Sequence, residues 1–419
     1  MTHLLGVCPI ATPIRPRLHR PGGAGWAVVP LLLLAYVGFV SLGLPDGLLG
    51  VGWPHLRAEL GEPVGAVGFI LFMATGGYLL ASVSAGFATA RVGVGWLLAG
   101  STALTAAGLA GFGVAPALVA VVAAALLLGL GAGAIDSGLN AYAARHFGAR
   151  HMNWLHASFG FGATLGPLVM TGALAAGLSW RGGYGAVALA QGLLAVGFVA
   201  SVRAWRDGQP GGSPPAAPPP PSTGAEPRAV RTLALPAVWR GAAAFIAYAG
   251  VELGAGLWAY TLLTSGRGMD EQLAGLAVSA YWGSLFVGRL LVGAVAEQVG
   301  THRMLTGSLA GMVAGAALVA APAPGPVAVA GLMLVGLAAA PVFPLLTLTT
   351  AERVGDGHAD RAIGVQVGAA ALGGTALPAG IGVLIGRLGP EVLGPCVLGF
   401  ALVLAALYLP SRRPIGVGP

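Results

Sequence analysis

The stretch that decides the fold of this chain is GLGAGAIDSGLNAYAARH, residues 129–146. It closes the segment between Arg91 and Arg145, in which Asp136 is the only charged residue. An apolar run of about 20 residues is long enough to cross a bilayer as a helix. A carboxylate at the centre of such a helix costs at least about 2.5–3.5 kcal/mol. We therefore expect Asp136 to face protein or water inside a helix bundle and to have a functional use there.

The composition of the whole chain is typical of a polytopic helical membrane protein. Of its 419 residues, 56% are hydrophobic and 8% are charged, and the mean hydropathy is +0.83. A soluble domain carries roughly a quarter charged residues. The alternating segments of about ten residues that a transmembrane barrel requires do not occur in the sequence.

Twelve apolar runs, ended by charges, Pro and Gly, predict an all-α protein with twelve transmembrane helices in two six-helix bundles. The predicted spans are residues 27–51, 64–89, 95–113, 116–142, 154–175, 184–203, 240–263, 273–296, 304–321, 326–350, 364–385 and 392–410. The stretch PGGSPPAAPPPPSTGAEP cannot pack a core and predicts an extended connection. The predicted organisation is a tail (1–26), an N-terminal bundle (27–205), a Pro-rich linker (206–238), a C-terminal bundle (239–410) and a second tail (411–419).

The arginines are concentrated in both tails, the linker and the loops on the same side of the predicted spans. This distribution predicts that both termini are cytoplasmic, and it explains the net charge of +7 without nucleic-acid binding. We expect a multi-pass protein of the bacterial cytoplasmic (inner) membrane, surrounded by lipid and acting as a monomer. Cys8 and Cys396 form neither a disulfide framework nor a metal-binding pattern, and we expect no metal or cofactor.

Short segments repeat between the two halves at a nearly constant spacing. LLAGS (97–101) matches MLTGS (304–308), and GFATARVG (86–93) matches GAVAEQVG (293–300), both at an offset of 207 residues. FVSLGLPDGLL (39–49) pairs with the seventh-span segment beginning at Tyr248 at an offset of 209. Two bundles related by such a repeat place a binding site near the midplane, between the halves.

The segment GRLLVGAVAEQVGTHR, residues 288–303, resembles the G-x-x-x-D-R-x-G-R-R signature of the major facilitator superfamily. Glu297 stands at the acidic position and Arg303 near the basic end, while the first-half copy keeps Arg91 but has Ala90 at the acidic position. The resemblance implies two pseudo-symmetric bundles, alternating access, and gating contacts that involve these residues. We interpret Arg289 as a structural or gating cation that pairs with an acid of a neighbouring span.

Three further stretches resemble the fucose/glucose–proton symporters: GLGAGAIDSGLNAY (129–142), YAGVELGAGLW (248–258) and GLAAAPVFPLLTLT (336–349). In that family, carboxylates of spans one and four serve proton coupling and sugar binding. The matching positions here are Asp46 and Asp136, and the polar fifth-span position of the family falls on His156. The resemblance implies proton-coupled import of a neutral hexose or deoxyhexose.

Asp46, Asp136 and Glu252 lie in the interior of predicted spans and are the candidate proton-coupling residues. Asp46 follows Pro45, which predicts a broken first span with an acid at the break. The alternative for Asp46 is a carboxylate at the outer end of its helix, because Trp53-Pro54 follows closely. For Asp136 and Glu252 the alternative is a structural hydrogen bond between spans.

Polar and aromatic side chains within the spans are candidate substrate contacts, because sugar rings stack on aromatic faces while hydroxyls bind polar groups. Some of them have a simpler explanation, since Trp and Tyr near span ends form interfacial belts and a histidine at a span end is ordinary. The candidates are Asn140, His156, Trp258, Tyr281, Trp282 and Gln366.

The sequence contains no nucleophile–base pair, metal-ligand cluster or nucleotide-binding loop, and we expect no enzyme. The first functional hypothesis is a proton-coupled sugar importer. The second is a proton-driven multidrug or metabolite efflux antiporter, because GFGATLGPLVMTG (160–172) partly resembles the fifth-span motif of antiporters. The third is a non-transporting sensor or assembly partner.

Overall fold

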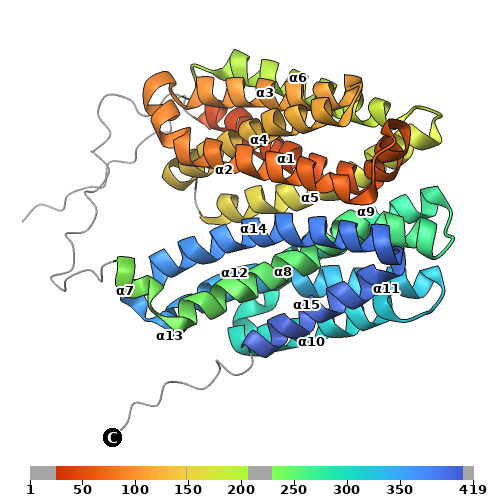
Figure 1. Ribbon diagram of the computed structural model, residues 1–419. Coiled ribbons are helices and arrows are strands. Elements are labelled where there is room, and N and C mark those ends of the chain that lie inside the picture. Colours follow the sequence, from red (N-terminus) through yellow and green to blue (C-terminus); the bar gives the residue numbers. More distant parts are fainter. Residues whose placement is uncertain (1–24, 148, 206–228, 409–419) are drawn as a thin grey trace, which may run out of the picture.

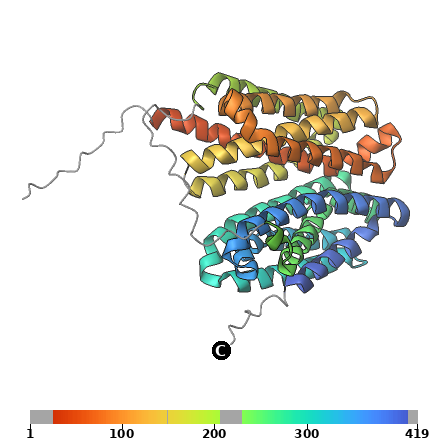
Figure 2. The same cartoon turned by 60° about the vertical axis from the view of Figure 1, so that its left-hand side comes forward.

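The computed structural model describes residues 25–147, 149–205 and 229–408. Residues 1–24 of the predicted N-terminal tail, with Cys8, the predicted C-terminal tail and most of the predicted linker lie outside these residues. The described chain forms two groups of roughly parallel helices, one from each half of the sequence, stacked against each other (Figures 1 and 2).

The N-terminal group contains six long helices. They are α1 (Gly25–Leu60), α2 (Val67–Val92), α3 (Val94–Val114), α4 (Leu118–His146), α5 (Ala149–Ala175) and α6 (Trp180–Ser201), with a 3₁₀ turn, η1 (Val64–Ala66), before α2. Within this group α2 and α3 pack on α4, α1 packs on α5, and α3 also packs on α6.

The C-terminal group also supplies six spans. Its helices are α8 (Pro236–Thr261), α9 (Glu271–Val299), α10 (Thr301–Ala320), α11 (Gly325–Ala339), α12 (Val342–Leu348), α14 (Asp356–Leu388) and α15 (Leu393–Tyr408), with short α7 (Ala229–Leu233) and α13 (Thr350–Val354). A π-helical turn, η2 (Leu262–Gly266), follows α8, and a 3₁₀ turn, η3 (Pro390–Val392), precedes α15. The two groups meet through α5 with α9, α1 with α8, and α2 with α14.

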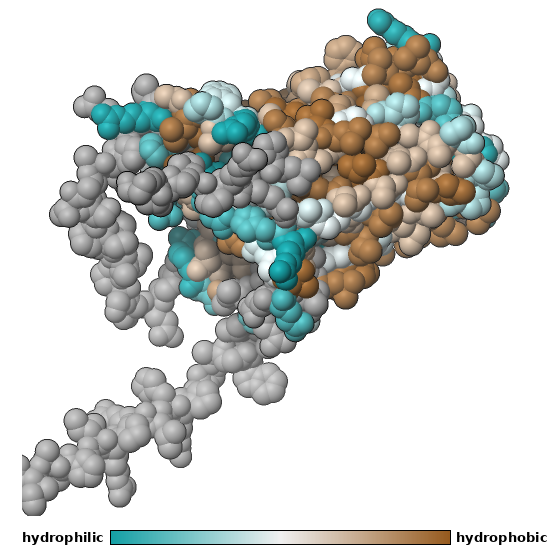
Figure 3. Space-filling view, turned by 90° about the horizontal axis from the view of Figure 1, so that it is seen from below, coloured by the Kyte–Doolittle hydropathy of each residue, from teal (hydrophilic) through white to brown (hydrophobic). Residues whose placement is uncertain are grey.

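In the described residues, 12 helical segments are long and apolar enough to cross a membrane, which confirms the predicted fold class. Seen from the side of the C-terminal group, hydrophobic residues cover the middle of the molecule and hydrophilic residues gather toward its two ends (Figure 3). This band is the surface that a helical membrane protein presents to hydrocarbon.

The predicted end and the predicted break of the first span are wrong. The first span does not end at residue 51 and is not broken at Pro45, since α1 continues to Leu60 with Pro30, Pro45 and Pro54 inside it. Asp46 therefore lies in the body of a long helix, and not at its outer end. Prolines are tolerated in spans because neighbouring helices and local adjustments satisfy the freed backbone groups. The tenth span, in contrast, is divided into α11 and α12 next to Pro341.

The sequence repeat is visible in how glycines pack. Gly129 of α4 lies against the backbone of Ala74 in α2, and Gly336 of α11 lies against the backbone of Tyr281 in α9. Gly336 follows Gly129 by 207 residues, and Tyr281 follows Ala74 by the same 207 residues. The two halves thus use one helix-packing scheme, in which glycines let backbones approach closely.

The contact between Gly129 and Ala74 yields a stability prediction. A Cβ at Gly129 would meet the carbonyl oxygen of Ala74, which belongs to the backbone of another helix and cannot rotate away. Gly129→Ala should therefore lower the free energy of unfolding by about 1–3 kcal/mol through overpacking. Thermal unfolding of the purified protein measures this.

Gly86→Ala is the matched control, because a Cβ at that helical position of α2 meets nothing within 4 Å. It should be neutral or slightly stabilising, since Ala has the higher helix propensity. Equal melting temperatures for Gly129→Ala and the unaltered protein would contradict the packing argument.

Candidate functional site

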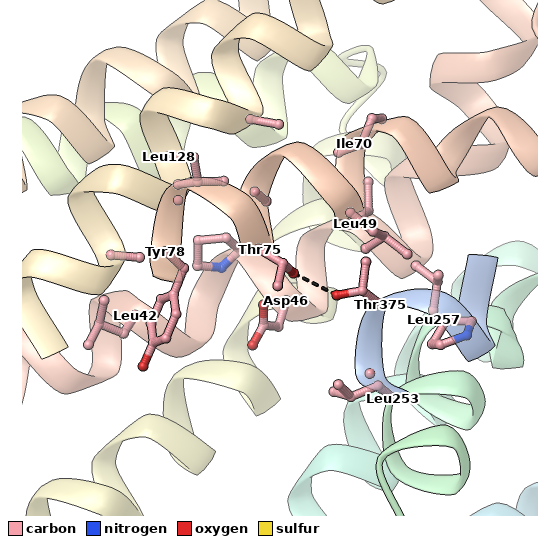
Figure 4. A pocket seen from close by; sticks show the side chains of 18 of the residues that line it. Leu42, Asp46, Leu49, Ile70, Thr75, Tyr78, Leu128, Leu253, Leu257 and Thr375 are labelled. Atoms are coloured by element: carbon pink, nitrogen blue, oxygen red, sulfur yellow. Dashed lines mark hydrogen bonds between the residues drawn. The ribbon is translucent and has the colours of Figure 1, made fainter. Parts of the chain in front are cut away.

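A cavity of about 290 Å³ lies where the two bundles meet, and residues of both bundles line it. Its wall is mostly apolar, with Leu42, Leu49, Ile70 and Leu128 on one side and Leu253 and Leu257 on the other (Figure 4). Among the described residues that line it, Asp46 is the only one with an ionisable carboxylate or a basic group. The volume is near the lower end of the roughly 300–1,000 Å³ typical of small-molecule sites.

Hydroxyl groups join the two bundles at this cavity. The Oγ1 atoms of Thr75 in α2 and Thr375 in α14 are 2.7 Å apart, and both residues line the cavity (Figure 4). Elsewhere between the bundles, the Ser279 hydroxyl of α9 donates to the carbonyl of Thr164 in α5 at 2.6 Å. Of these two hydrogen bonds between the halves, that between Thr75 and Thr375 lies at the cavity.

Asp136 is held by two neutral donors. The Tyr78 hydroxyl of α2 donates to Asp136 Oδ2 at 2.5 Å, and the Asn140 side-chain amide donates to Oδ1 at 2.9 Å. Gly133 packs against the backbone of Tyr78, so α2 and α4 are close enough for the first bond. Because Tyr78 lines the cavity, one hydrogen bond connects Asp136 with it.

Glu252 is held by a cation. Arg289 Nη2 of α9 lies 3.1 Å from Glu252 Oε1 of α8, with side chains that are 27% and 12% exposed. The Tyr281 hydroxyl donates to the backbone carbonyl of Glu252 at 2.7 Å. Arg289 therefore pairs with an acid of a neighbouring span.

Asp46 is the acid that faces the cavity directly. Its side chain is exposed there, and the structure shows no hydrogen-bond or ion-pair partner for it among the described residues. It lies within electrostatic range of Glu252 and of Tyr78. His156 lies within range of both Asp136 and Arg289, and its ring meets Phe39 edge-on at 5.4 Å. Asp46 thus lies within range of one other predicted acid, Glu252, and of Tyr78, the hydrogen-bond partner of Asp136.

The remaining candidates separate into one cavity residue and three packing residues. Trp282 lines the cavity, and its buried indole N–H has no hydrogen-bond partner. Trp258 is buried and its indole N–H donates to the carbonyl of Pro378 at 2.8 Å, while the Gln366 side-chain oxygen accepts from Thr350 at 2.8 Å. These bonds give Trp258 and Gln366 a role in packing the C-terminal bundle. Tyr281 has the same role through its bond to the backbone carbonyl of Glu252.

The side chain of the predicted gating residue Glu297 lies outside the described residues. The other three, Arg91, Arg289 and Arg303, do not line the cavity. Arg91 is exposed at the end of α2, and Arg303 is exposed at the start of α10. Of these three, Arg289 alone reaches the bundle interior.

Sequence reasoning missed Tyr78 and the threonine pair Thr75–Thr375. The usable signal for Tyr78 was a hydroxylated aromatic residue in the middle of an apolar span. Threonines carry no such signal, because a helix can satisfy a threonine hydroxyl with its own backbone. Their pairing depends on how the two halves dock, which the sequence of either half does not contain.

Comparison with known proteins identifies the family. The model of the Major Facilitator Superfamily matches residues 35–378 and, in a second match, residues 241–417. The chain belongs to the Major Facilitator Superfamily. It is a multi-pass membrane transporter and not an enzyme. No curated protein matches it.

Solved transporters share the fold of this superfamily member. A variant of the nucleoside transporter NupG superposes with a TM-score of 0.71 at 15% identity, covering 92% of this chain and 100% of that one. A D-xylose–proton symporter gives a TM-score of 0.69 at 16% identity, covering 90% and 97%. A bacterial homologue of the human lysosomal transporter Spinster gives 0.70 at 13% identity, covering 94% and 98%. At these identities the likeness shows the fold alone.

The ion pair in the C-terminal bundle yields a second prediction. Arg289→Met should lower the free energy of unfolding by about 3 kcal/mol, because it leaves the Glu252 carboxylate uncompensated in the bundle interior. The double variant Arg289→Met/Glu252→Gln should recover most of this loss. Arg303→Met, at an exposed arginine, is the control. A double variant no more stable than the single one would refute the pairing.

Proposed function

We propose that this transporter is a proton-coupled symporter that imports a small neutral hydroxylated solute, a hexose or deoxyhexose, by alternating access. The observation that carries the proposal is a pair of unpartnered polar groups, one from each bundle, among the described residues that line the cavity. Asp46 offers carboxylate acceptors, and Trp282 offers a buried N–H donor. A hydroxyl both donates and accepts hydrogen bonds, so a polyol can satisfy both groups at once.

The charges around the cavity favour a neutral substrate over an anion. Glu252 is balanced by Arg289, and the carboxylate of Asp46 faces the space that the substrate would occupy. An anionic solute would be repelled there and would require a cationic ligand. The structural likeness to a D-xylose–proton symporter agrees with a sugar substrate.

The bonds of Asp136 suggest how protonation reaches the substrate. An ionised carboxylate accepts from both Tyr78 and Asn140, as observed. A protonated carboxyl group can instead donate to the Tyr78 oxygen, in which case the Tyr78 O–H points away from Asp136. Because Tyr78 lines the cavity, we propose that its reorientation transmits the protonation of Asp136 to the substrate site.

We propose that the structure corresponds to the state closed on the outer side. Thr75 lies in the first half of α2, and His55, whose Nε2 is 3.3 Å from the Tyr260 hydroxyl, lies near the end of α1. Both links are on the side opposite to Gly25, at the start of α1. The arginine distribution supports cytoplasmic termini and hence an outer location for these links, in a bacterial inner membrane.

A second candidate is export of a lipophilic cation. The specific observation in its favour is the apolar cavity wall, on which Asp46 is the single carboxylate among the described lining residues. A carboxylate in an apolar site attracts an organic cation, and it has no such preference for a neutral polyol.

Transport in proteoliposomes distinguishes the two candidates. Labelled hexoses and deoxyhexoses are offered with and without an inward proton gradient, and a lipophilic cation is offered in parallel. Gradient-driven accumulation of one sugar supports the symporter. Gradient-driven extrusion of the cation, without sugar uptake, refutes the symporter and supports the exporter.

The coupling proposal yields a third prediction. Asp136→Asn should abolish uphill accumulation while leaving the exchange of labelled for unlabelled substrate measurable, because the amide carries no titratable proton. Tyr78→Phe should lower accumulation about tenfold by removing the link between Asp136 and the cavity. Ser137→Ala, at the next position of α4, is the control and should behave like the unaltered protein. Full accumulation by Asp136→Asn would refute its coupling role.

A further inference from the structure

The N-terminal bundle carries an ion pair at the end of the molecule where α1 and α8 finish. Arg181 at the start of α6 donates from Nη2 to Glu59 Oε1 near the end of α1, at 2.8 Å. The Arg181 Nη1 atom donates to the carbonyl of Gly113 at the end of α3, at 3.1 Å. The indole N–H of Trp180 donates to Glu59 Oε2 at 2.6 Å. The pair Glu59–Arg181, which we call the N-clamp, therefore joins the first, third and sixth helices of its bundle.

The C-terminal bundle has an ion pair at the corresponding place. Arg267 directly follows η2, the turn that ends the first helix of this bundle, and its Nη2 atom lies 2.8 Å from Glu391 Oε2, just before α15. The same guanidinium donates to the carbonyls of Val319 and Ala321 at the end of α10, at 3.1 Å and 2.8 Å. The pair Arg267–Glu391, which we call the C-clamp, therefore joins the same three helix positions of the second bundle.

The two clamps are related by the repeat, but their charges are inverted. Arg267 follows Glu59 by 208 residues, and Glu391 follows Arg181 by 210, close to the offset of 207 between the starts of α3 and α10. The acid is on the first helix of the N-terminal bundle and precedes the sixth helix of the C-terminal bundle. If the first helix of one bundle packed on the sixth helix of the other, Glu59 would meet Glu391. In the reciprocal pairing, Arg267 would meet Arg181.

Such wrong pairings compete with the correct ones because the two bundles share one helix-packing scheme. In lipid, helices associate through close packing and not through burial of apolar surface, so apolar faces of two similar bundles are poorly distinguished. The hydrogen bond between His55 of α1 and Tyr260 of α8 shows that the helix ends next to the two clamps meet. During assembly, each first helix therefore has two similar sixth helices within reach.

We propose that the inverted clamps specify which helices belong to one bundle, by making each wrong pairing of a first with a sixth helix repulsive. Their contribution to stability is small, because Glu59 and Glu391 are 44% and 51% exposed and ion pairs of this kind stabilise little. Discrimination is larger, since it adds the attraction in the correct pair to the repulsion in the wrong one. The proposal does not depend on which solute the protein transports.

Two double variants of the full chain separate pairing from stability. Glu59→Arg/Arg181→Glu reverses the N-clamp, so the correct pair stays attractive while both wrong pairs become attractive as well. The C-clamp shows that this polarity suits these helix positions. Glu59→Gln/Arg181→Gln removes the N-clamp, so the correct pair loses its attraction and the wrong pairs become neutral. Arg57→Glu/Glu62→Arg is the matched control, because it reverses two charges near the end of α1 that belong to neither clamp.

The measurement is the yield of native monomer after denaturation in SDS and refolding into lipid–detergent micelles. Size-exclusion chromatography gives the yield, and thermal unfolding gives the melting temperature of the recovered monomer. Reversal of the N-clamp should lower the yield about threefold and removal should lower it less, while the control refolds like the unaltered chain. The melting temperature should follow the opposite order, with removal below reversal. In about 1 M salt, where charges are screened within about 3 Å, the yields should converge.

Every outcome supports or overturns the proposal. A reversed N-clamp that has the lowest yield but keeps the melting temperature of the unaltered chain supports it. The proposal is overturned if the reversed and unaltered chains refold with equal yield, or if the yields simply follow the melting temperatures, because the clamps then act on stability alone. If reversal gives no native monomer at low salt, recovery of the monomer in about 1 M salt supports the proposal, and no recovery overturns it.

Discussion

The close approach of α2 and α4 is the constraint on which the site depends. Gly129 and Gly133 of α4 lie against the backbone of Ala74 and Tyr78 in α2, one helical turn apart. This contact places the Tyr78 hydroxyl 2.5 Å from Asp136 Oδ2. A side chain at either glycine would separate the helices, and the carboxylate would lose its link to the cavity. The stretch GLGAGAID therefore contains both the glycines that let α2 and α4 pack closely and the carboxylate of the candidate site.

The two halves share this packing but differ in charge. Asp136 accepts from a hydroxyl and an amide, whereas Glu252 is paired with Arg289. The two bundles thus share the packing of their helices, while their acids have different hydrogen-bond partners.

The sequence predicted the twelve spans and the repeat because hydropathy and residue spacing are local properties of the chain. It failed at Pro45 and Pro54, where the packing of neighbouring helices allows α1 to continue. It did not distinguish Trp282, which lines the cavity, from Trp258 and Gln366, which do not, because a span position does not reveal which side of the helix faces the cavity. The choice between Trp282, on the cavity wall, and Trp258, bonded to Pro378, depends on how α8, α9 and α14 dock.

The docking of the two bundles produces both the hydrogen bonds between them and the cavity between them. The hydrogen bond between Thr75 and Thr375 closes the same space that Asp46, Tyr78 and Trp282 line. A solute in this cavity would lie next to this bond, and rocking of one bundle against the other would break it. Helix α2 thus carries both Thr75, which bonds to the opposite bundle at the cavity, and Tyr78, which lines the cavity and donates to Asp136.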